Sequence, residues 1–195
     1  MTDKKSALRK EAFAARKAAH EAGHDHVAND HLIGLLDTMA GAVVAAYMPI
    51  RTELSPLPTM EHLCARGRRV CVPVIRGPGQ ALDFREWRPG CVMVNGPFGA
   101  AVPQDGATLT PAIVITPLVA WDRTGGRLGY GGGFYDRSFA ELGTARAVGF
   151  AYGAQELLSV PREPTDWPLD LIVTETGVLQ PAHPDPDLAP GTPGA

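Results

Sequence analysis

The chain has 195 residues, of which 45% are hydrophobic and 20% are charged, and its formal net charge at pH 7 is −3. A chain of this length buries enough apolar surface to fold as one domain without a metal or a disulfide. Its acidic balance argues against a general affinity for nucleic acid or an anionic membrane. No stretch has the roughly 18 apolar residues of a membrane span, and the N-terminus lacks a signal-peptide core. The three cysteines form no CxxC pair and suit a reducing compartment, so we expect a cytoplasmic protein.

Helical and strand patterns alternate along the chain. Apolar residues in the first twenty positions recur at spacings of three and four, which predicts an amphipathic helix that ends at Gly23. The later predicted elements are, in chain order, helix 27–40, strand 42–48, helix 56–66, strands 69–75, 82–87 and 112–120, helix 134–142, and strands 145–151 and 169–174. The alternating strand 82–87 is expected at a sheet edge. Short apolar strands between helices indicate an α/β fold with a largely parallel sheet.

The last fifteen residues differ from the rest in composition. Residues 181–195 are rich in proline and contain almost no large apolar side chain. Such a segment has little to bury, so we expect a disordered tail behind a single domain that spans residues 1–180.

A glycine-rich segment, residues 121–137, follows the strongest strand pattern and precedes a helix. Ligands of open α/β sheets bind where strands end and helices begin. The glycines that can bring backbone N–H groups close to an anion are Gly129, Gly131, Gly132 and Gly133. The helix that begins near Phe134 adds its partial positive end. Taken alone, the glycines also suit a tight strand-to-helix turn, and no Lys-Ser/Thr pair follows them as in a Walker A motif.

The side chains beside these glycines favour a phosphate site over a plain turn. Arg127 can pair with phosphate oxygens. Asp136 can coordinate a Mg²⁺ that bridges phosphates. Phe134 and Tyr135 offer planar surfaces to a ring. The segment therefore predicts a site for a nucleotide phosphate.

These residues resemble the 5-formyltetrahydrofolate cyclo-ligase family, also called 5,10-methenyltetrahydrofolate synthetase. The run RLGYGGGFYDR at 127–137 is close to that family's most specific signature, and the resemblance covers roughly residues 4–180. The other similar segments, in the same order, are KSALR at 5–9 with Arg16 further on, YMPIRTE at 47–53, FREWRPG at 84–90, GPFG at 96–99 and TDWPLDLIVTE at 165–175.

The resemblance implies a single Rossmann-like three-layer α/β domain. It also implies an ATP-dependent ligase that converts 5-formyltetrahydrofolate to 5,10-methenyltetrahydrofolate and releases ADP and phosphate. In the implied mechanism the formyl oxygen is phosphorylated and N10 closes the ring. The expected cofactor is Mg²⁺, and the expected partners are ATP and 5-formyltetrahydrofolate, with or without a polyglutamate chain. We expect a monomer.

The resemblance also implies individual roles. The residues expected to act in catalysis are Lys5, Arg9 and Arg127. Those expected to bind ATP are Lys5, Arg9, Arg127, Gly129, Tyr130, Gly131, Gly132, Gly133, Phe134 and Tyr135. Those expected to bind the folate are Met48, Glu53 and Tyr135, and those expected to bind Mg²⁺ are Asp136 and Asp166.

Two alternatives stand beside this interpretation. By spacing alone, Lys5 and Arg9 are an ordinary solvated pair on one helix face, and Glu53 is a surface carboxylate. Val102 and Thr165 depart from the residues more usual in the family and leave room for a shifted substrate. The rival functions are therefore a nucleotide- or folate-binding protein without turnover, and an ATP-dependent ligase or kinase for another metabolite.

Overall fold

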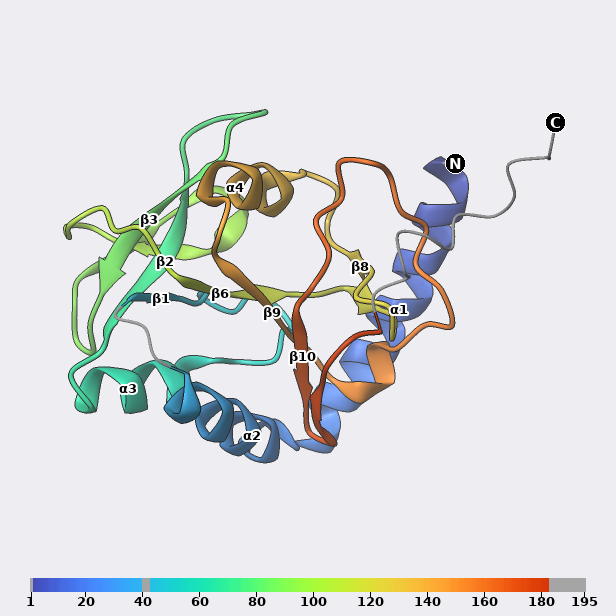
Figure 1. Ribbon diagram of the computed structural model, residues 1–195, viewed down its shortest axis with the longest axis horizontal. Coiled ribbons are helices and arrows are strands. Elements are labelled where there is room, and N and C mark those ends of the chain that lie inside the picture. The colour runs from blue at the N-terminus through green and yellow to red at the C-terminus, as the bar shows by residue number, and fades with distance from the viewer. Residues whose placement is uncertain (1, 40–42, 183–195) are drawn as a thin grey trace, which may run out of the picture.

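The structure, a computed structural model, describes residues 2–39 and 43–182 (Figure 1). The helices are α1 (Thr2–Ala22), α2 (Asp25–Thr38), α3 (Leu57–Ala65) and α4 (Phe134–Leu142), with short 3₁₀ turns η1 (Pro97–Gly99) and η2 (Gly153–Gln155). The strands are β1 (Val43–Ala45), β2 (Arg69–Ile75), β3 (Leu82–Trp87), β4 (Met93–Asn95), β5 (Ala101–Pro103), β6 (Ile113–Pro117), β7 (Ala120–Trp121), β8 (Arg127–Leu128), β9 (Arg146–Phe150), β10 (Leu171–Thr174) and β11 (Gly177–Leu179).

In the described part of the chain, seven strands form the central sheet in the order β11-β10-β9-β6-β1-β2-β3. The inner pairs are parallel, and the edge strands β3 and β11 run antiparallel to their neighbours. From β1 the chain first adds β2 and β3 on one side. It then returns to the other side of β1 and adds β6, β9 and β10, so the strand order reverses between β1 and β6. Open sheets of this kind bind ligands beyond the carboxyl ends of the strands at that reversal.

Helices cover both faces of the sheet. α4 lies on one face, and α2 and α3 lie on the other (Figure 1). One apolar cluster joins α2 and α3 to the sheet through residues such as Leu32, Leu36 and Met60, and a second joins α4 to the opposite face around Phe139. A parallel sheet needs cover on both faces, so this is the predicted three-layer α/β arrangement, which is confirmed.

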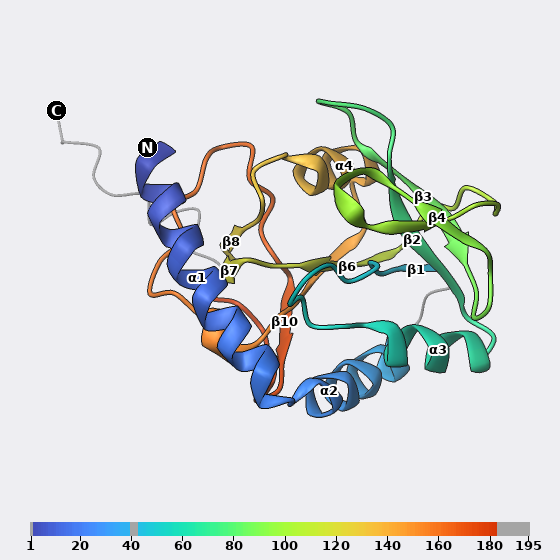
Figure 2. The same ribbon diagram turned by 180° about the vertical axis from the view of Figure 1, so that it is seen from behind.

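Helix α1 lies beside the sheet rather than on either face of it. Figure 2 shows α1 alongside the hairpin of β7 and β8. A small apolar cluster joins them, with Ala12 of α1 packed near Val119, Ala120 and Leu128. The hairpin leads directly into the glycines at 129–133, so this packing brings the N-terminal helix to the predicted phosphate site.

Several predicted elements differ in extent. The predicted strand 112–120 is two strands, because β6 leaves the central sheet after Pro117 and the chain then pairs as β7 with β8 in a separate sheet. The small sheet of β4 and β5 was not predicted, since strands of three residues carry too little periodicity. Strands β2 and β3 and helix α4 have the predicted bounds, and β3 is an edge strand as expected.

The described chain ends at Ala182, whose N–H donates a hydrogen bond to the carbonyl of Arg123 at 3.1 Å. Residues 183–195 of the predicted disordered tail lie outside the described residues, and the domain boundary at residue 180 stays a prediction. Within residues 2–39 and 43–182, no helix combines the length and apolar character that a membrane crossing requires.

Candidate active site

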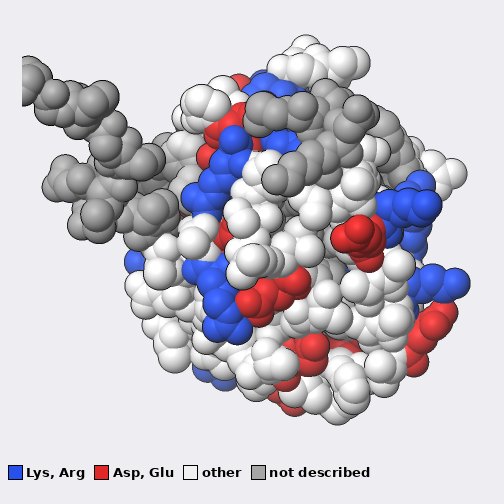
Figure 3. Space-filling model, turned by 90° about the vertical axis from the view of Figure 1, so that its right-hand side faces the viewer, with Lys and Arg blue, Asp and Glu red and all other residues white. Residues whose placement is uncertain are grey.

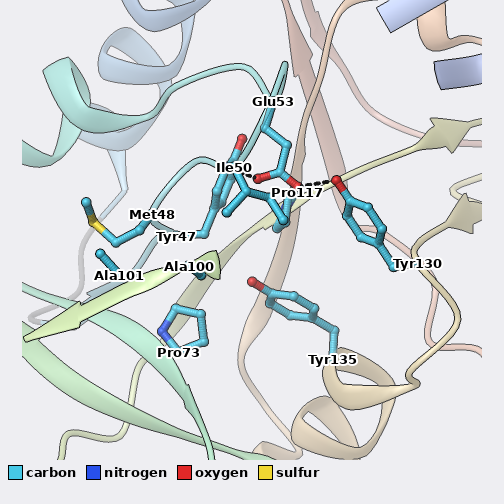
Figure 4. Close-up of a pocket in the computed structure, with 10 residues that line it drawn as sticks. All are labelled: Tyr47, Met48, Ile50, Glu53, Pro73, Ala100, Ala101, Pro117, Tyr130 and Tyr135. Atoms are coloured by element: carbon cyan, nitrogen blue, oxygen red, sulfur yellow. Dashed lines mark hydrogen bonds between the residues drawn. The ribbon is translucent and has the colours of Figure 1, made fainter. Parts of the chain in front are cut away.

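A cavity of about 120 Å³ opens beyond the carboxyl ends of β1 and β6, at the reversal of strand order (Figure 4). It is lined by Tyr47, Met48, Ile50, Glu53, Pro73, Ala100, Ala101, Pro117, Tyr130 and Tyr135. The walls are mostly apolar or aromatic, with the Glu53 carboxylate as the charged group among them. The three residues predicted to bind the folate, Met48, Glu53 and Tyr135, therefore line one cavity.

The turn that follows Met48 fixes Glu53. Arg51 has a positive φ of 54°, which a side-chain-bearing residue adopts only when the surroundings hold it there. Two hydrogen bonds close the turn: the Glu53 N–H donates to the Ile50 carbonyl at 3.1 Å, and the Ile50 N–H donates to Glu53 Oε2 at 2.9 Å. The Tyr130 hydroxyl donates to Glu53 Oε1 at 3.0 Å.

Glu53 is 5% exposed, and its burial raises the pKa of the carboxyl above the ordinary value. The hydrogen bonds from Ile50 and Tyr130 and the charges of Arg16 and Arg51 act in the opposite direction. The carboxylate is thus desolvated but supplied with donors on both oxygens, which suits a group that orients a polar ligand edge in an apolar cavity.

The glycine-rich loop runs from β8 to α4 and contacts α1. Gly131 and Gly133 have positive φ angles of 99° and 63°, and Gly133 is the N-cap of α4. Arg9 Nε donates a hydrogen bond to the Gly129 carbonyl at 2.9 Å. A Cβ atom at Gly131 would lie 3.2 Å from Arg9 Nη2. The predicted cation on α1 and the predicted phosphate loop are therefore in contact.

Lys5, one helical turn before Arg9, reaches the segment that precedes β10. Lys5 Nζ lies 2.7 Å from Glu163 Oε1 and 3.5 Å from Asp166 Oδ2. The hydrogen bond to Glu163, assisted by the charge of Asp166, raises the pKa of Lys5. The ammonium group stays protonated and lies next to a residue that the sequence assigned to metal binding.

Arg127 forms the link between the loop and that segment. Its guanidinium, 8% exposed, donates to Asp136 Oδ1 and to the Trp167 carbonyl and lies 5.4 Å from the centre of the Phe139 ring. Burial lowers the pKa of Arg127, and the charges of Asp136 and Asp166 oppose that shift. A direct contact between Arg127 and a phosphate would have to replace or supplement one of these bonds.

Within the described ranges, no three His, Cys, Asp or Glu side chains gather into a protein metal cage. Asp136 receives its hydrogen bonds from Arg127 and Trp167 on Oδ1, and the bonds to Asp166 fall on Oδ2. Mg²⁺ commonly takes one or two carboxylates and completes its shell with phosphate oxygens and water. The two aspartates fit a cation that arrives with a nucleotide, and their assignment as ligands stays a prediction.

The placement of Tyr130 adds to the prediction made from the sequence. The sequence put it among the predicted ATP-binding residues of the glycine-rich loop. Its backbone lies in that loop, and its side chain lines the cavity and donates a hydrogen bond to Glu53. Sequence reasoning gave no role to Glu163, which bonds Lys5, or to Arg16, which is buried beside Glu53. The signal for Arg16 was its position, because residues 5, 9 and 16 fall on one face of a helix.

Basic side chains on this side of the molecule do not form one continuous field. Figure 3 views the side on which α1 lies, and its blue Lys and Arg patches alternate with red Asp and Glu patches. The three cations predicted to act on phosphate, Lys5, Arg9 and Arg127, are held individually by contacts with Glu163, the Gly129 carbonyl and Asp136.

The 5-formyltetrahydrofolate cyclo-ligase family model matches residues 1–175. A 5-formyltetrahydrofolate cyclo-ligase of Mycolicibacterium smegmatis is 31% identical over 183 residues, which cover 87% of this chain and 93% of the relative. The enzyme of the same name from Escherichia coli is 35% identical over 146 residues, or 70% of this chain and 80% of the relative.

Solved structures agree with the sequence relatives. The 5,10-methenyltetrahydrofolate synthetase of Aquifex aeolicus superposes with a TM-score of 0.75 at 28% identity, covering 90% of this chain and 92% of that one. The synthetase of Mycoplasma pneumoniae has a TM-score of 0.70 at 26% identity, covering 88% and 98%. The resemblance noted in the sequence is confirmed, and the chain belongs to the 5-formyltetrahydrofolate cyclo-ligase family, whose members are ligases.

Proposed function

We propose that the chain catalyses the ATP-dependent conversion of 5-formyltetrahydrofolate to 5,10-methenyltetrahydrofolate, with release of ADP and phosphate. The observation that carries this proposal is the hydrogen bond from Tyr130 to Glu53. Tyr130 belongs to the glycine-rich loop and Glu53 to the folate cavity, so the two proposed substrate sites share a wall. A phosphoryl group bound at the loop would then lie within reach of a formyl group held in the cavity.

The chemistry explains why two adjoining sites are needed. A formamide carbonyl is a weak electrophile, and its oxygen is a poor leaving group. The formyl oxygen attacks the γ-phosphorus, the bond to the β-phosphate oxygen breaks, and ADP leaves. N10 then attacks the formyl carbon, the carbon–oxygen bond breaks, and inorganic phosphate departs as N10 loses its proton. The product is the methenyl cation, in which nitrogen shares the positive charge.

The cationic side chains are proposed to bind and orient the nucleotide phosphates. Phosphoryl transfer depends mainly on positioning and charge neutralisation. Arg9 supplies a positive charge beside the loop, and Lys5 supplies another beside Asp166. The glycine N–H groups and the N-terminus of α4 add donors. Arg127 supports the site by holding Asp136 and the Trp167 carbonyl, and it contributes its own charge.

Asp136 and Asp166 are the residues that would hold Mg²⁺, which when bound with ATP neutralises phosphate charge. Phe134 and Tyr135, at the start of α4, are proposed to flank the nucleotide as part of the same loop. Tyr135 also lines the cavity, and we propose that it contacts the folate there as well.

In the folate cavity, Glu53 is proposed to accept hydrogen bonds from the N–H edge of the pterin. Met48 and Tyr135 offer apolar surface to the ring system. A buried carboxylate that already holds two donors is oriented before the ligand arrives, which lowers the cost of binding. We further propose that the enzyme acts in the cytoplasm as a monomer, and light scattering of the purified protein tests the oligomeric state.

The decisive experiment combines purified protein, 5-formyltetrahydrofolate and MgATP, and follows the absorbance band of the methenyl product together with ADP release. The expected result is one ADP for each methenyl product. Binding of both ligands without product would favour a binding protein, and ADP release with another formylated substrate only would favour a different ligase. Turnover that persists in excess chelator would contradict the Mg²⁺ assignment.

A further inference from the structure

Arg16 is the largest fully buried side chain of the described chain, and it has no part in the proposed function. It is 1% exposed, although it lies on α1, whose other charged residues mostly face solvent. A buried guanidinium is costly unless its charge and its N–H groups find partners. The contacts of Arg16 therefore indicate what its burial is for.

Those contacts tie three segments together. Arg16 Nε donates to Thr52 Oγ1 at 3.1 Å, and Nη2 donates to the Tyr130 hydroxyl at 3.1 Å. The guanidinium also lies 5.1 Å from the centre of the Phe13 ring and 5.8 Å from that of Tyr130, as in cation–π pairs. Arg16 thus joins α1 to the turn that carries Glu53 and to the glycine-rich loop.

The third nitrogen makes a contact of another kind. Among the described residues, Nη1 has no hydrogen-bond partner although it is buried, and it lies 3.8 Å from Glu53 Oε1. Both side chains of this ion pair are almost fully buried, at 1% and 4% exposure. At that distance and burial the attraction is substantial without a hydrogen bond, because little water screens it. The charge of Arg16 is directed at the carboxylate of the folate cavity.

We propose that Arg16 is the positioning residue of the folate cavity, whose guanidinium keeps Glu53 ionised and turned toward the ligand while holding Tyr130 in place as its donor. The proposal rests on the proposed function for the identity of the ligand. Arg16 acts through Glu53 and Tyr130, because its side chain is buried and is not among the residues that line the cavity.

The hydrogen bonds run in one direction. Arg16 donates to the Tyr130 oxygen, and the Tyr130 hydroxyl donates in turn to Glu53 Oε1. A donor whose oxygen already accepts a charged N–H is polarised and becomes a better donor. Arg16 therefore supports the carboxylate twice, through space and through the phenol.

Other groups also face Glu53, and together with burial they affect how easily its carboxyl group ionises. The charge of Arg51, in the same turn, lowers the pKa of the carboxyl, and the hydroxyls of Tyr47 and Tyr135 lie near it on the cavity side. Burial acts against ionisation and is the largest effect. Arg51 is exposed, so water screens its charge, and Arg16 is the buried cation beside the carboxylate.

The test compares Arg16→Gln and Arg16→Lys with Lys17→Gln, a matched control on the next position of α1 whose side chain is 68% exposed. Steady-state kinetics with each substrate are measured across pH. In Arg16→Gln the KM for 5-formyltetrahydrofolate should rise about tenfold at neutral pH, as for loss of a charge-assisted contact, with less than about a twofold change for ATP. The acid limb of kcat/KM for the folate should move to higher pH.

Arg16→Lys should bring that acid limb back toward the parent position, because the positive charge returns. Its KM should stay raised, since one ammonium cannot reach Thr52, Tyr130 and Glu53 together. A purely structural role would lower the melting temperature and leave the acid limb of Arg16→Gln where it was, and that result overturns the proposal. An equal rise in the KM for ATP would overturn it as well.

Two further measurements keep the proposal testable. If Arg16→Gln fails to fold, Thr52→Ala replaces it, since that change removes the acceptor of Nε and Thr52 does not line the cavity. A smaller upward shift of the acid limb is expected, because the guanidinium keeps its charge but loses the bond that holds it beside Glu53. An unchanged limb overturns the proposal. If the parent protein has no activity, the proposed function fails, and carbon-13 NMR of the Glu53 carboxyl without ligand still tests Arg16. Its titration should then move to higher pH in Arg16→Gln.

Discussion

Arg9 and Gly129 are 120 positions apart in the sequence, and a 2.9 Å hydrogen bond from Arg9 Nε to the Gly129 carbonyl joins them. The bond attaches the N-terminal helix to the loop that the sequence predicts to bind phosphates. The bond does not use the two terminal nitrogens of the guanidinium, of which Nη2 lies beside Gly131. The arrangement holds a cation at the loop before any nucleotide binds.

Arg9→Ala should therefore weaken the binding of ATP more than the binding of the folate. We expect the KM for ATP to rise about tenfold or more, since a charge-assisted bond to phosphate is lost, with little change in the KM for 5-formyltetrahydrofolate. Each KM is measured at saturating levels of the other substrate. Lys17→Ala is the control, because its side chain is 68% exposed on the same helix. A larger effect on the folate than on ATP would contradict the division of the site.

Gly131→Ala tests the conformation of the loop. Gly131 has a φ of 99°, and a Cβ atom there would lie 3.2 Å from Arg9 Nη2. We expect a loss of stability of about 1–3 kcal/mol from the strained backbone, together with a raised KM for ATP because Arg9 is displaced.

Gly143→Ala is the matched control for that strain. Gly143 also has a positive φ, 67°, but ends α4 away from the loop, and a Cβ atom there would meet nothing within 4 Å. Its stability should fall by a similar amount while the KM for ATP stays unchanged. Equal kinetic effects in both variants would mean that lost stability, and not the loop, controls ATP binding.

Arg127→Ala should destabilise the protein as well as impair turnover. The variant removes the side-chain donor of the Trp167 carbonyl and one of the two donors to Asp136, and it removes the contact with Phe139. We expect a loss of about 3 kcal/mol, the lower end for breaking a buried pair, because Asp136 keeps 24% of its side chain exposed. Denaturant unfolding measures this loss of unfolding free energy. Arg123→Ala, which breaks the exposed pair with Glu156, should lower stability far less than Arg127→Ala.

The regular elements could be predicted from the sequence because their patterns are local. Strands β2 and β3 and helix α4 have enough residues for period and end signals to define them. The pairs β4–β5 and β7–β8 could not be predicted, because strands of two or three residues exist only through their partners. The reversal of strand order that forms the cavity is likewise a property of the whole sheet.

The candidate site was predicted as separate segments, and the fold supplies the connections between them. No spacing rule links Lys5 to Glu163 or Arg127 to the Trp167 carbonyl, since each pair joins distant parts of the chain. Arg16 was missed as a site residue for a physical reason: charges on an amphipathic helix are usually solvated, and only the tertiary contacts with Thr52 and Tyr130 account for its burial.

Two truncations test the predicted domain boundary. Pro181 is buried against Gly125, with 3.3 Å between its Cβ and a Cβ built at Gly125, and the Ala182 N–H bonds the Arg123 carbonyl. Removal of residues 183–195 should change the melting temperature by less than about 2 °C, because the segment has little apolar surface to bury. Removal of 181–195 should lower it further. If removal of residues 183–195 alone lowered the melting temperature by more than about 2 °C, the tail would pack on the domain.

Glu53→Gln should change how stability depends on pH. Burial raises the folded-state pKa of Glu53, so the folded protein binds a proton more tightly than the unfolded chain does. By linkage, the parent protein loses stability from this group as pH rises from the unfolded pKa, near 4.5, through the higher folded pKa. The uncharged amide has no such loss. The difference in unfolding free energy, variant minus parent, should therefore increase with pH across this window, by about 1.4 kcal/mol for each unit of pKa shift.

Urea unfolding of both proteins at several pH values between 4 and 8 measures that difference, and the other titrating groups cancel in the subtraction. The amide can still accept one of the hydrogen bonds that Ile50 and Tyr130 donate, so the variant should stay folded. The same variant should raise the KM for the folate and leave that for ATP nearly unchanged. A stability difference that stays constant or falls as pH rises would mean that Glu53 is ionised at no cost, and that Arg16 and the two donors fully compensate for its burial.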